Sequence, residues 1–278
     1  MAPTAQQDTL FILLGASRGY GRSIVKIAAK CIGQQIRRAL FIGRDVPGMQ
    51  ETALALSDVN PNITSSFHKL DLSDNGDVIQ KEISLILSLP MLLTGIRKLY
   101  IFLNSGLLTP AFFASHHLPE AIYKSTAVNF ASFCIVNTEL MKFLHTISAD
   151  MQKNVGGDIP VLKTVRIIQI SSGAAVRPIP ALSIYCSVKA ARNMYFQVLA
   201  KEIELEADLQ RFDIKLLNWS PGPMETSMFQ ELRESDLPAR TDMMQHMSLI
   251  STEESATHLF TILQKDSYPS AAIIDVFD

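Results

Sequence analysis

Short apolar runs alternate with longer segments of helical periodicity along almost the whole chain. The apolar runs have the character of buried strands, and the segments between them repeat apolar residues three and four positions apart. The runs lie at residues 10–14, 38–43, 63–69, 98–104, 164–171, 212–218 and 271–276. The helical segments lie at residues 19–31, 46–58, 75–88, 117–150, 183–208 and 252–264. This alternation predicts parallel βαβ units with right-handed crossovers.

Seven strands in one chain predict an α/β fold, with a single doubly wound parallel sheet and helices on both faces. The 278 residues suit one large domain of this kind. The sequence contains no internal repeat, low-complexity tract or interdomain linker. We therefore expect one domain over residues 1–278, with a nucleotide-binding part at about 9–110 and a catalytic and substrate part at about 111–278.

Two stretches do not follow this alternation. Asp150–Thr164 contains Gly156-Gly157 and reads as an extended loop. Pro221–Ser251 is rich in proline and methionine and follows a strand end, where open α/β sheets bind ligands. We interpret it as a mobile substrate lid, and the alternative is a surface excursion containing a helical hairpin.

Composition removes several classes of function. A net charge of −2 and a pI near 6.3 give no sign of nucleic-acid binding. No apolar stretch approaches the roughly 20 residues of a membrane span, and the N-terminus lacks a signal-peptide pattern, which favours the cytoplasm. Three cysteines form neither a disulfide framework nor a zinc motif, and His116-His117 lacks matching ligands, so we expect no metal site.

A glycine-rich turn lies between the first strand and the first helix. The segment Gly15–Gly21 reads Gly-Ala-Ser-Arg-Gly-Tyr-Gly, with the glycines spaced Gly-x3-Gly-x-Gly. Glycines permit a tight turn and a close approach of the backbone to a ligand, and a helix N-terminus attracts pyrophosphate. The residues predicted to bind a dinucleotide here are Gly15, Ser17, Arg18, Gly19, Tyr20 and Gly21.

The end of the second strand bears on cofactor choice. Arg44 follows that strand, and Arg18 lies within the glycine turn. Arginine accommodates a ribose 2′-phosphate, whereas an acidic residue near this point binds the 2′-hydroxyl of NAD. Two cations favour NADPH, although Asp45 lies one residue from the acidic position. The alternative is that Arg44 and Asp45 simply begin a solvated helix.

A serine, a tyrosine and a lysine form the candidate catalytic set. Tyr185 and Lys189 are four residues apart, so a helix places them on one face. Ser172 ends the preceding strand. A nearby cation favours phenolate and lowers the pKa of a tyrosine, which then exchanges a proton with a substrate oxygen near neutral pH. The pattern predicts carbonyl/alcohol redox chemistry. The alternative is a helix-capping serine and an amphipathic pair.

Together these motifs resemble the short-chain dehydrogenase/reductase family, in the order in which that family carries them and over essentially the whole chain. The resemblance implies a Rossmann-like fold, with Asn129 joining Ser172, Tyr185 and Lys189 as catalytic residues. It implies that Tyr185 and Lys189 also contact the cofactor. The further cofactor-binding positions that it implies are Asp71, Leu72, Asn104, Pro221, Gly222, Met224 and Thr226.

Closer similarity within the family points to a pterin reductase. It is carried by the segments 15–22, 181–194, 196–200, 217–226 and 271–278. This resemblance implies that Asp275 anchors the pterin, because a carboxylate accepts paired hydrogen bonds from amino and ring N–H groups. The alternative for Asp275 is a solvated acid.

The family resemblance further implies a homodimer formed by the long helices near residues 117–150 and 183–208. Two rival functions remain open. One is a general NADPH-dependent carbonyl or diketone reductase, and the other is a non-catalytic NADPH-binding sensor.

Overall fold

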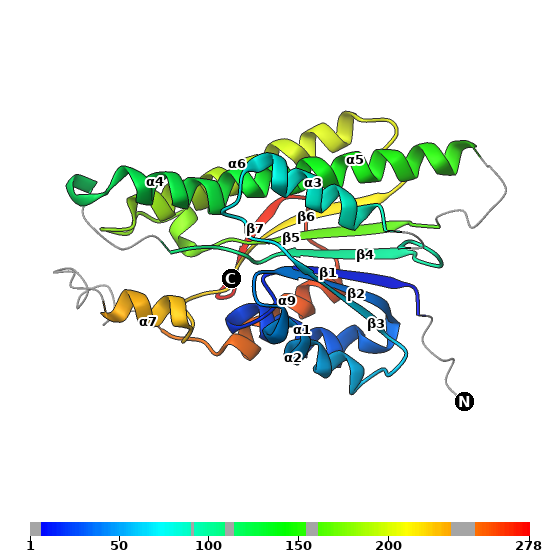
Figure 1. Ribbon diagram of the computed structural model, residues 1–278, viewed down its shortest axis with the longest axis horizontal. Helices are drawn as coiled ribbons and strands as arrows, with labels where there is room; N and C mark the ends of the chain where they lie inside the picture. Colours follow the sequence, from blue (N-terminus) through cyan, green and yellow to red (C-terminus); the bar gives the residue numbers. More distant parts are fainter. Residues whose placement is uncertain (1–6, 90–91, 109–113, 154–160, 235–247) are drawn as a thin grey trace.

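The computed structural model describes residues 7–89, 92–108, 114–153, 161–234 and 248–278 (Figure 1). Seven parallel strands form one sheet in the order β3-β2-β1-β4-β5-β6-β7. The strands are β1 (Thr9–Leu14), β2 (Ile36–Gly43), β3 (Thr64–Lys69), β4 (Lys98–Leu103), β5 (Thr164–Ile170), β6 (Asp213–Ser220) and β7 (Ala272–Asp275). The order reverses between β1 and β4, and the predicted doubly wound sheet is confirmed.

Helices cover both faces of this sheet (Figure 1). One face carries α1 (Gly19–Ile32), α2 (Val46–Ser57) and α9 (Thr252–Lys265). The other carries α3 (Gly76–Leu87), α4 (Pro119–Thr126), α5 (Ser132–Lys153) and α6 (Ser183–Leu205), and α7 (Ser227–Glu234) lies toward one end of the molecule. Short 3₁₀ turns occupy Gly33–Gln35, Ala114–His116 and Gly173–Ala175. Each face has its own apolar core.

Burial along the strands explains why the apolar runs identified them. Every residue of β1 is buried, because β1 is central and helices cover both of its faces. The edge strand β3 reads Thr-Ser-Ser-Phe-His-Lys and is only partly covered. Polar residues on an edge strand limit unwanted pairing with other chains.

The segment 117–150 differs from the single helix expected. It begins at Pro119, and a π-helical turn at Ala127–Ala131 separates α4 from α5. A π turn inserts an extra residue and rotates the side chains that follow it. Asn129 lies within this turn and is fully buried.

The stretches predicted as a loop and a lid are described only in part. Residues 154–160 of the loop and 235–247 of the lid lie outside the described residues. The helix α5 extends into the predicted loop, 150–164, as far as Lys153. The predicted lid contains α7, and its two ends meet where the Ile250 amide donates to Pro223 O at 3.1 Å. Leu232 of α7 packs near Tyr185. Whether this segment moves stays a prediction.

The first and last helices are joined through the core beneath the glycine turn. The Tyr20 hydroxyl accepts a hydrogen bond from Trp219 Nε1 at 2.7 Å and is hydrogen-bonded to Ser255 Oγ at 3.2 Å. Ser255 Oγ in turn donates to Pro221 O at 2.8 Å. Among the described residues, no helix has the length and apolar character that crossing a membrane requires.

Candidate active site

The glycine turn brings the end of β1 into contact with the start of α1. Gly15 and Gly19 have φ values of +86° and +55°, in the left-handed region that favours glycine. A β-carbon at Gly21 would lie 1.9 Å from Gly15 O, so only glycine fits. The side chain of Arg18 makes no capping hydrogen bond to α1. The first backbone amides of this helix are therefore left for another acceptor.

Two other segments meet this turn. Asn104, which follows β4, donates through Nδ2 to Gly15 O at 2.7 Å. A β-carbon built on Gly19 would lie 3.9 Å from Thr226 Cγ2, so the segment after β6 reaches the start of α1. Within that segment Gly222 has a φ of +78° and Met224 forms a β-bridge with Ile250. The structure therefore brings these predicted cofactor residues together at the carboxyl ends of the strands.

Tyr20 takes a different orientation. Its side chain is 6% exposed and points into the core, where burial raises the pKa of its phenol. Only its backbone belongs to the surface of the turn. Ser17 contributes its carbonyl oxygen, which accepts from Arg22 Nη2 at 2.9 Å.

The end of β2 separates the roles of Arg44 and Asp45. Asp45 Oδ1 accepts a hydrogen bond from the Gly48 amide at 3.0 Å and caps α2. Arg44 is 68% exposed, with Nη1 3.8 Å from Asp71 Oδ2. Asp45 therefore caps a helix, as the alternative interpretation expected. Arg44 remains accessible to a ligand.

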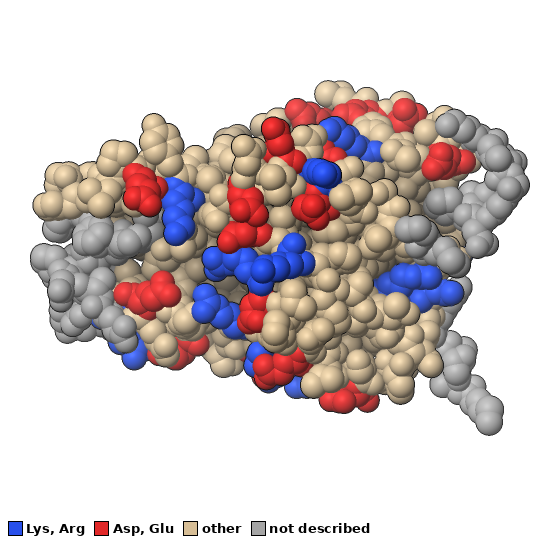
Figure 2. All heavy atoms as spheres, viewed as in Figure 1, with Lys and Arg blue, Asp and Glu red and all other residues tan. Residues whose placement is uncertain are grey.

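Asp71 lies on the same rim. Partial burial opposes its ionisation, but hydrogen bonds from Ser73 and the charges of Arg44 and Lys124 hold the pKa of Asp71 below its usual value. Leu72, the next residue, packs partly against the core. In Figure 2, lysine and arginine side chains, with an acidic side chain next to them, border a hollow near the middle of this face, where the strands of Figure 1 reach their carboxyl ends.

Ser172, Tyr185 and Lys189 meet at the end of β5. Ser172 begins a 3₁₀ turn, and its Oγ accepts from the Ala174 amide at 3.1 Å. A hydrogen bond from Ser172 also acts on the Tyr185 phenol. Lys189 Nζ lies 5.6 Å from the centroid of the Tyr185 ring and donates to Ile170 O at 2.7 Å. The three side chains therefore share one site.

The protonation of this trio corrects one expectation. Burial raises the pKa of Tyr185 to about 12, whereas the Tyr–Lys spacing predicted a lowered value. Burial, and then the charge of Arg192, hold the pKa of Lys189 well below its usual range. The largest influence that lowers the Tyr185 pKa is Arg192. Helical spacing identified the neighbours correctly but carried no information about how deeply they are buried.

Asn129 lies beside this group. Its Oδ1 accepts from the Leu107 amide at 2.8 Å, and its Nδ2 donates to Leu107 O at 2.8 Å and to Ser125 Oγ at 3.1 Å. A β-carbon at Gly106 would lie 3.4 Å from Asn129 Oδ1 and 3.9 Å from Lys189 Nζ. Asn129 therefore supports the backbone that faces Lys189.

Asp275 also reaches the site. A β-carbon at Gly173 would lie 3.9 Å from Asp275 Oδ2, which places this carboxylate next to the turn that Ser172 begins. Ser220 Oγ donates to Asp275 Oδ2 at 2.6 Å, and the Phe277 amide donates to Oδ1 at 3.2 Å. Asp275 is partly buried and held in place, unlike the solvated acid of the alternative interpretation.

Sequence reasoning missed two residues of this region. Ser220 orients Asp275, and Arg192 lies in the core beside Lys189. Arg192 follows Lys189 by three positions and Tyr185 by seven, so all three occupy one face of α6. That spacing was a usable signal.

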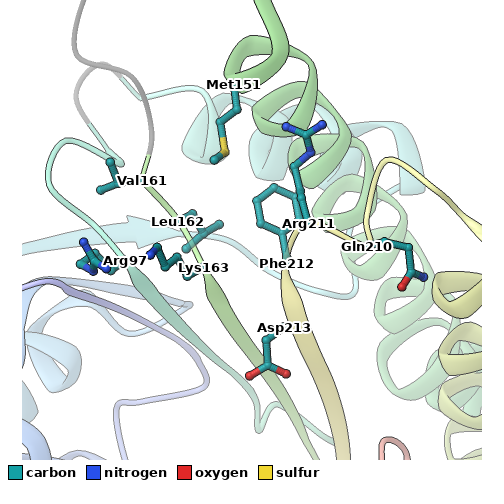
Figure 3. A pocket seen from close by; sticks show the side chains of 9 residues that line it. All are labelled: Arg97, Met151, Val161, Leu162, Lys163, Gln210, Arg211, Phe212 and Asp213. Carbon is teal, nitrogen blue, oxygen red and sulfur yellow. The ribbon is translucent and has the colours of Figure 1, made fainter. Parts of the chain in front are cut away.

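An open groove of about 940 Å³ lies elsewhere (Figure 3). Arg97, Lys163 and Phe212 line it, together with Asp213, and these residues precede or begin β4, β5 and β6. It therefore lies at the amino ends of the strands, opposite to Ser172 and Lys189. Ligands of open α/β sheets bind at the carboxyl ends, so this groove is separate from the candidate active site.

Comparisons with known proteins agree with this geometry. The family model described as short chain dehydrogenase matches residues 9–237. Sepiapterin reductase of Bos taurus is 28% identical, over 97% of this chain and 95% of that protein. Benzil reductase ((S)-benzoin forming) of Bacillus cereus is 25% identical, over 95% of this chain and 98% of that protein.

A solved structure shares the fold at low identity. It is 3-ketoacyl-(acyl-carrier-protein) reductase from Brucella melitensis, complexed with NADH. It superposes with a TM-score of 0.70 at 17% identity, over 98% of this chain and 97% of that one.

Proposed function

Because the chain belongs to the short-chain dehydrogenase family, we propose that it reduces the side-chain carbonyl of a pterin. It is an NADP-dependent oxidoreductase. The proposed substrates are sepiapterin and 6-pyruvoyl-tetrahydropterin, whose reduction ends in tetrahydrobiopterin. The single observation that carries this proposal is the carboxylate of Asp275, which Ser220 holds beside Gly173, the residue that follows Ser172.

The residues at the carboxyl ends of the strands fit NADPH. Gly15, Gly19 and Gly21 form a cradle that β-carbons would fill or strain, and the first amides of α1 suit a pyrophosphate. Arg44 is exposed and makes a long contact of 3.8 Å with Asp71, so it can approach a 2′-phosphate, whereas Asp45 is used as a helix cap. NADPH supplies the hydride for the carbonyl carbon when it is bound.

The protein's own groups handle the proton. We expect Ser172 to donate a hydrogen bond to the carbonyl oxygen and Tyr185 to give that oxygen a proton, since the phenol is protonated at neutral pH. Lys189 is proposed to hold the nicotinamide ribose beside Tyr185. Asn129 supports the backbone opposite Lys189 and is the proposed link to solvent for replacing the proton.

Asp275 suits recognition of a pterin. A carboxylate has about four acceptor positions, and Ser220 and the Phe277 amide occupy one on each oxygen. The remaining positions match a ligand edge with adjacent amino and ring N–H groups. Charge-assisted bonds of this kind fix orientation as well as affinity.

A second candidate function is reduction of diketones. It shares Ser172, Tyr185 and Lys189, and the similarity to benzil reductase favours it. A binding protein without turnover is a third reading, and the intact catalytic set argues against it.

The experiment that tests the proposal follows NADPH oxidation with sepiapterin and, in parallel, with diacetyl. Efficient turnover of sepiapterin at low micromolar concentration is the expected result. Turnover of diacetyl only would move the function to general carbonyl reduction. NADPH binding without NADPH oxidation in the presence of either substrate would support the non-catalytic sensor.

Asp275→Asn gives a residue-level test. It keeps the shape of the side chain but removes the charge that pairs with the pterin. We expect kcat/KM for sepiapterin to fall by roughly tenfold or more relative to that for diacetyl, the equivalent of one charged hydrogen bond. Equal effects on the two substrates would remove the pterin assignment's main support.

We also propose a homodimer through α5 and α6. Met194, Val198 and Leu205 are 60%, 49% and 85% exposed along α6, so this helix offers apolar surface to a second copy of the chain. Light scattering should give twice the chain mass of 30.8 kDa. Met194→Glu should yield a monomer, and Leu54→Glu, at a residue 59% exposed on α2, should not.

The proposed location is the cytoplasm. Cys31, Cys134 and Cys186 are all unpaired, which suits a reducing compartment.

A further inference from the structure

Arg192 is a cation enclosed in the protein without an acidic partner. Its side chain is 1% exposed, and no carboxylate among the described residues forms an ion pair with it. Burying a charge costs several kcal/mol unless other groups compensate. Arg166, the other arginine that is buried among the described residues, is paired with Asp213 and Asp266. An unpaired arginine retained at such a cost calls for a role.

Neutral groups hold the guanidinium in one orientation. Nε donates to Gln169 Oε1 at 2.8 Å, and Nη2 donates to Leu103 O at 3.0 Å. Nη1 donates to Ser105 O at 3.4 Å, and the carbon of the guanidinium lies 4.3 Å from the centroid of the Phe133 ring. These contacts use the planar fork that arginine has and lysine lacks.

The two backbone carbonyls that Arg192 binds, those of Leu103 and Ser105, lie on either side of Asn104 in the sequence. Asn104 is the residue that donates to Gly15 O in the glycine turn. The segment then continues through Gly106 to Leu107, which Asn129 holds by two hydrogen bonds. Arg192 therefore connects the catalytic helix α6 to the segment 103–107, and through it to the turn that is proposed to hold the cofactor.

The charge of Arg192 acts on both catalytic side chains. Burial lowers the pKa of Arg192 only to about 10, so the guanidinium stays charged at neutral pH. That charge lowers the pKa of Tyr185 and of Lys189. The other titratable groups that face this cluster are Cys134 of α5 and Cys186 of α6.

We propose that Arg192 is a positioning residue of the reductase site, which ties the segment 103–107 to α6 and places a permanent positive charge beside Tyr185 and Lys189. The proposal rests on the proposed catalytic roles of Tyr185 and Lys189 and not on the identity of the carbonyl substrate. The function assigned to Lys189 by sequence spacing, favouring the phenolate, falls in part to Arg192.

Two substitutions of Arg192 separate the effect of its positive charge from the effect of its planar, forked set of hydrogen-bond donors. Arg192→Gln removes the charge and keeps hydrogen-bond donors, whereas Arg192→Lys keeps the charge and loses the fork. We would measure the pH dependence of alcohol oxidation with NADP⁺, in which phenolate is the active form, and the NADPH dissociation constant by fluorescence. Tyr185→Phe identifies the limb of the pH profile that belongs to Tyr185.

Arg192→Gln should move that limb toward higher pH by about one unit, which lowers the rate of alcohol oxidation at a fixed pH below 10 roughly tenfold, because the phenolate loses a neighbouring cation. Arg192→Lys should leave the limb in place but weaken NADPH binding by roughly tenfold, because the segment beside the glycine turn is no longer held from both sides. The matched control is Arg166→Gln, which removes a buried arginine far from Tyr185 and should destabilise the fold without moving the limb.

An unshifted limb in Arg192→Gln would overturn the electrostatic role. Unchanged NADPH affinity in Arg192→Lys would overturn the positioning role. The same shift in Arg166→Gln would show that general loosening, rather than Arg192, is responsible. If wild type reduced neither sepiapterin nor diacetyl, the proposed function would fail, while the NADPH affinities would still decide whether Arg192 positions the segment.

Discussion

The α-carbon of Gly21 packs directly against the carbonyl oxygen of Gly15. A β-carbon at position 21 would lie 1.9 Å from that oxygen and 2.8 Å from Asn104 Nδ2. The first of these neighbours is backbone, so it has little freedom to retreat. The close packing of β1 against the start of α1 therefore requires a residue without a side chain at position 21.

Gly21→Ala should separate β1 from α1, destabilise the protein by about 1–3 kcal/mol as overpacking does, and weaken NADPH binding. Urea unfolding and fluorescence titration measure the two effects. Gly33→Ala is the control, because its nearest contact is the movable Val59 side chain at 3.0 Å and its φ of −53° is ordinary. Equal losses in the two variants would contradict the special role of Gly21.

Tyr185→Phe should lower kcat by roughly 10²–10⁴-fold, because the proton donor is lost, and leave the NADPH dissociation constant nearly unchanged. Steady-state kinetics and fluorescence titration test both parts. Tyr195→Phe, on the same helix but packed on Phe133, should retain activity. A parallel loss of NADPH binding in Tyr185→Phe would make the residue structural.

Arg44→Ala should weaken NADPH by roughly tenfold and NADH far less, since only NADPH carries the 2′-phosphate. The ratio of the two dissociation constants is the measurement. Arg211→Ala, beside the groove at the amino ends of the strands, controls for loss of one exposed cation. An unchanged ratio in Arg44→Ala would place the 2′-phosphate elsewhere.

Alkaline pH should destabilise the fold through Tyr185. Its pKa is raised from 10.0 to about 12 by burial, so the folded state holds the proton more tightly than the unfolded chain. The resulting stability is fully present below about pH 10 and is lost as pH rises toward 12, by roughly 1–2 kcal/mol. Tyr185→Phe should lose less stability between pH 8 and 11, and Tyr123→Phe, 75% exposed, should behave as wild type.

The sheet and most helices could be predicted because burial imposes a repeating pattern on neighbouring positions. The fully buried β1, apolar from Leu10 to Leu14, and the amphipathic α9 carry that pattern plainly. The π turn at Ala127–Ala131 was not predicted, because the segment 117–150 was treated as one continuous α-helix. The inserted residue has no signature in residue type and is recognised from the change in hydrogen-bond pattern and side-chain direction that it causes.

The candidate site was predictable where it depends on local spacing. Tyr185 and Lys189 are neighbours because they are one helical turn apart. Their pKa values depend instead on burial and on Arg192, whose surroundings come from β4, β5 and α5. The spacing of Arg192 indicated that it shares a helix face with Tyr185 and Lys189, but an arginine on a helix is usually exposed, so its burial was not expected.

The hydrogen bonds of Tyr20 to Trp219 and Ser255 can form only late in the synthesis of the chain. Ser255 leaves the ribosome 235 residues after Tyr20 (255 − 20), which takes roughly 10–50 s at typical rates of synthesis. The packing of α1 against α9 is therefore completed only after the last helix has been synthesised. Until then the glycine turn lacks the support that Ser255 gives it through Tyr20.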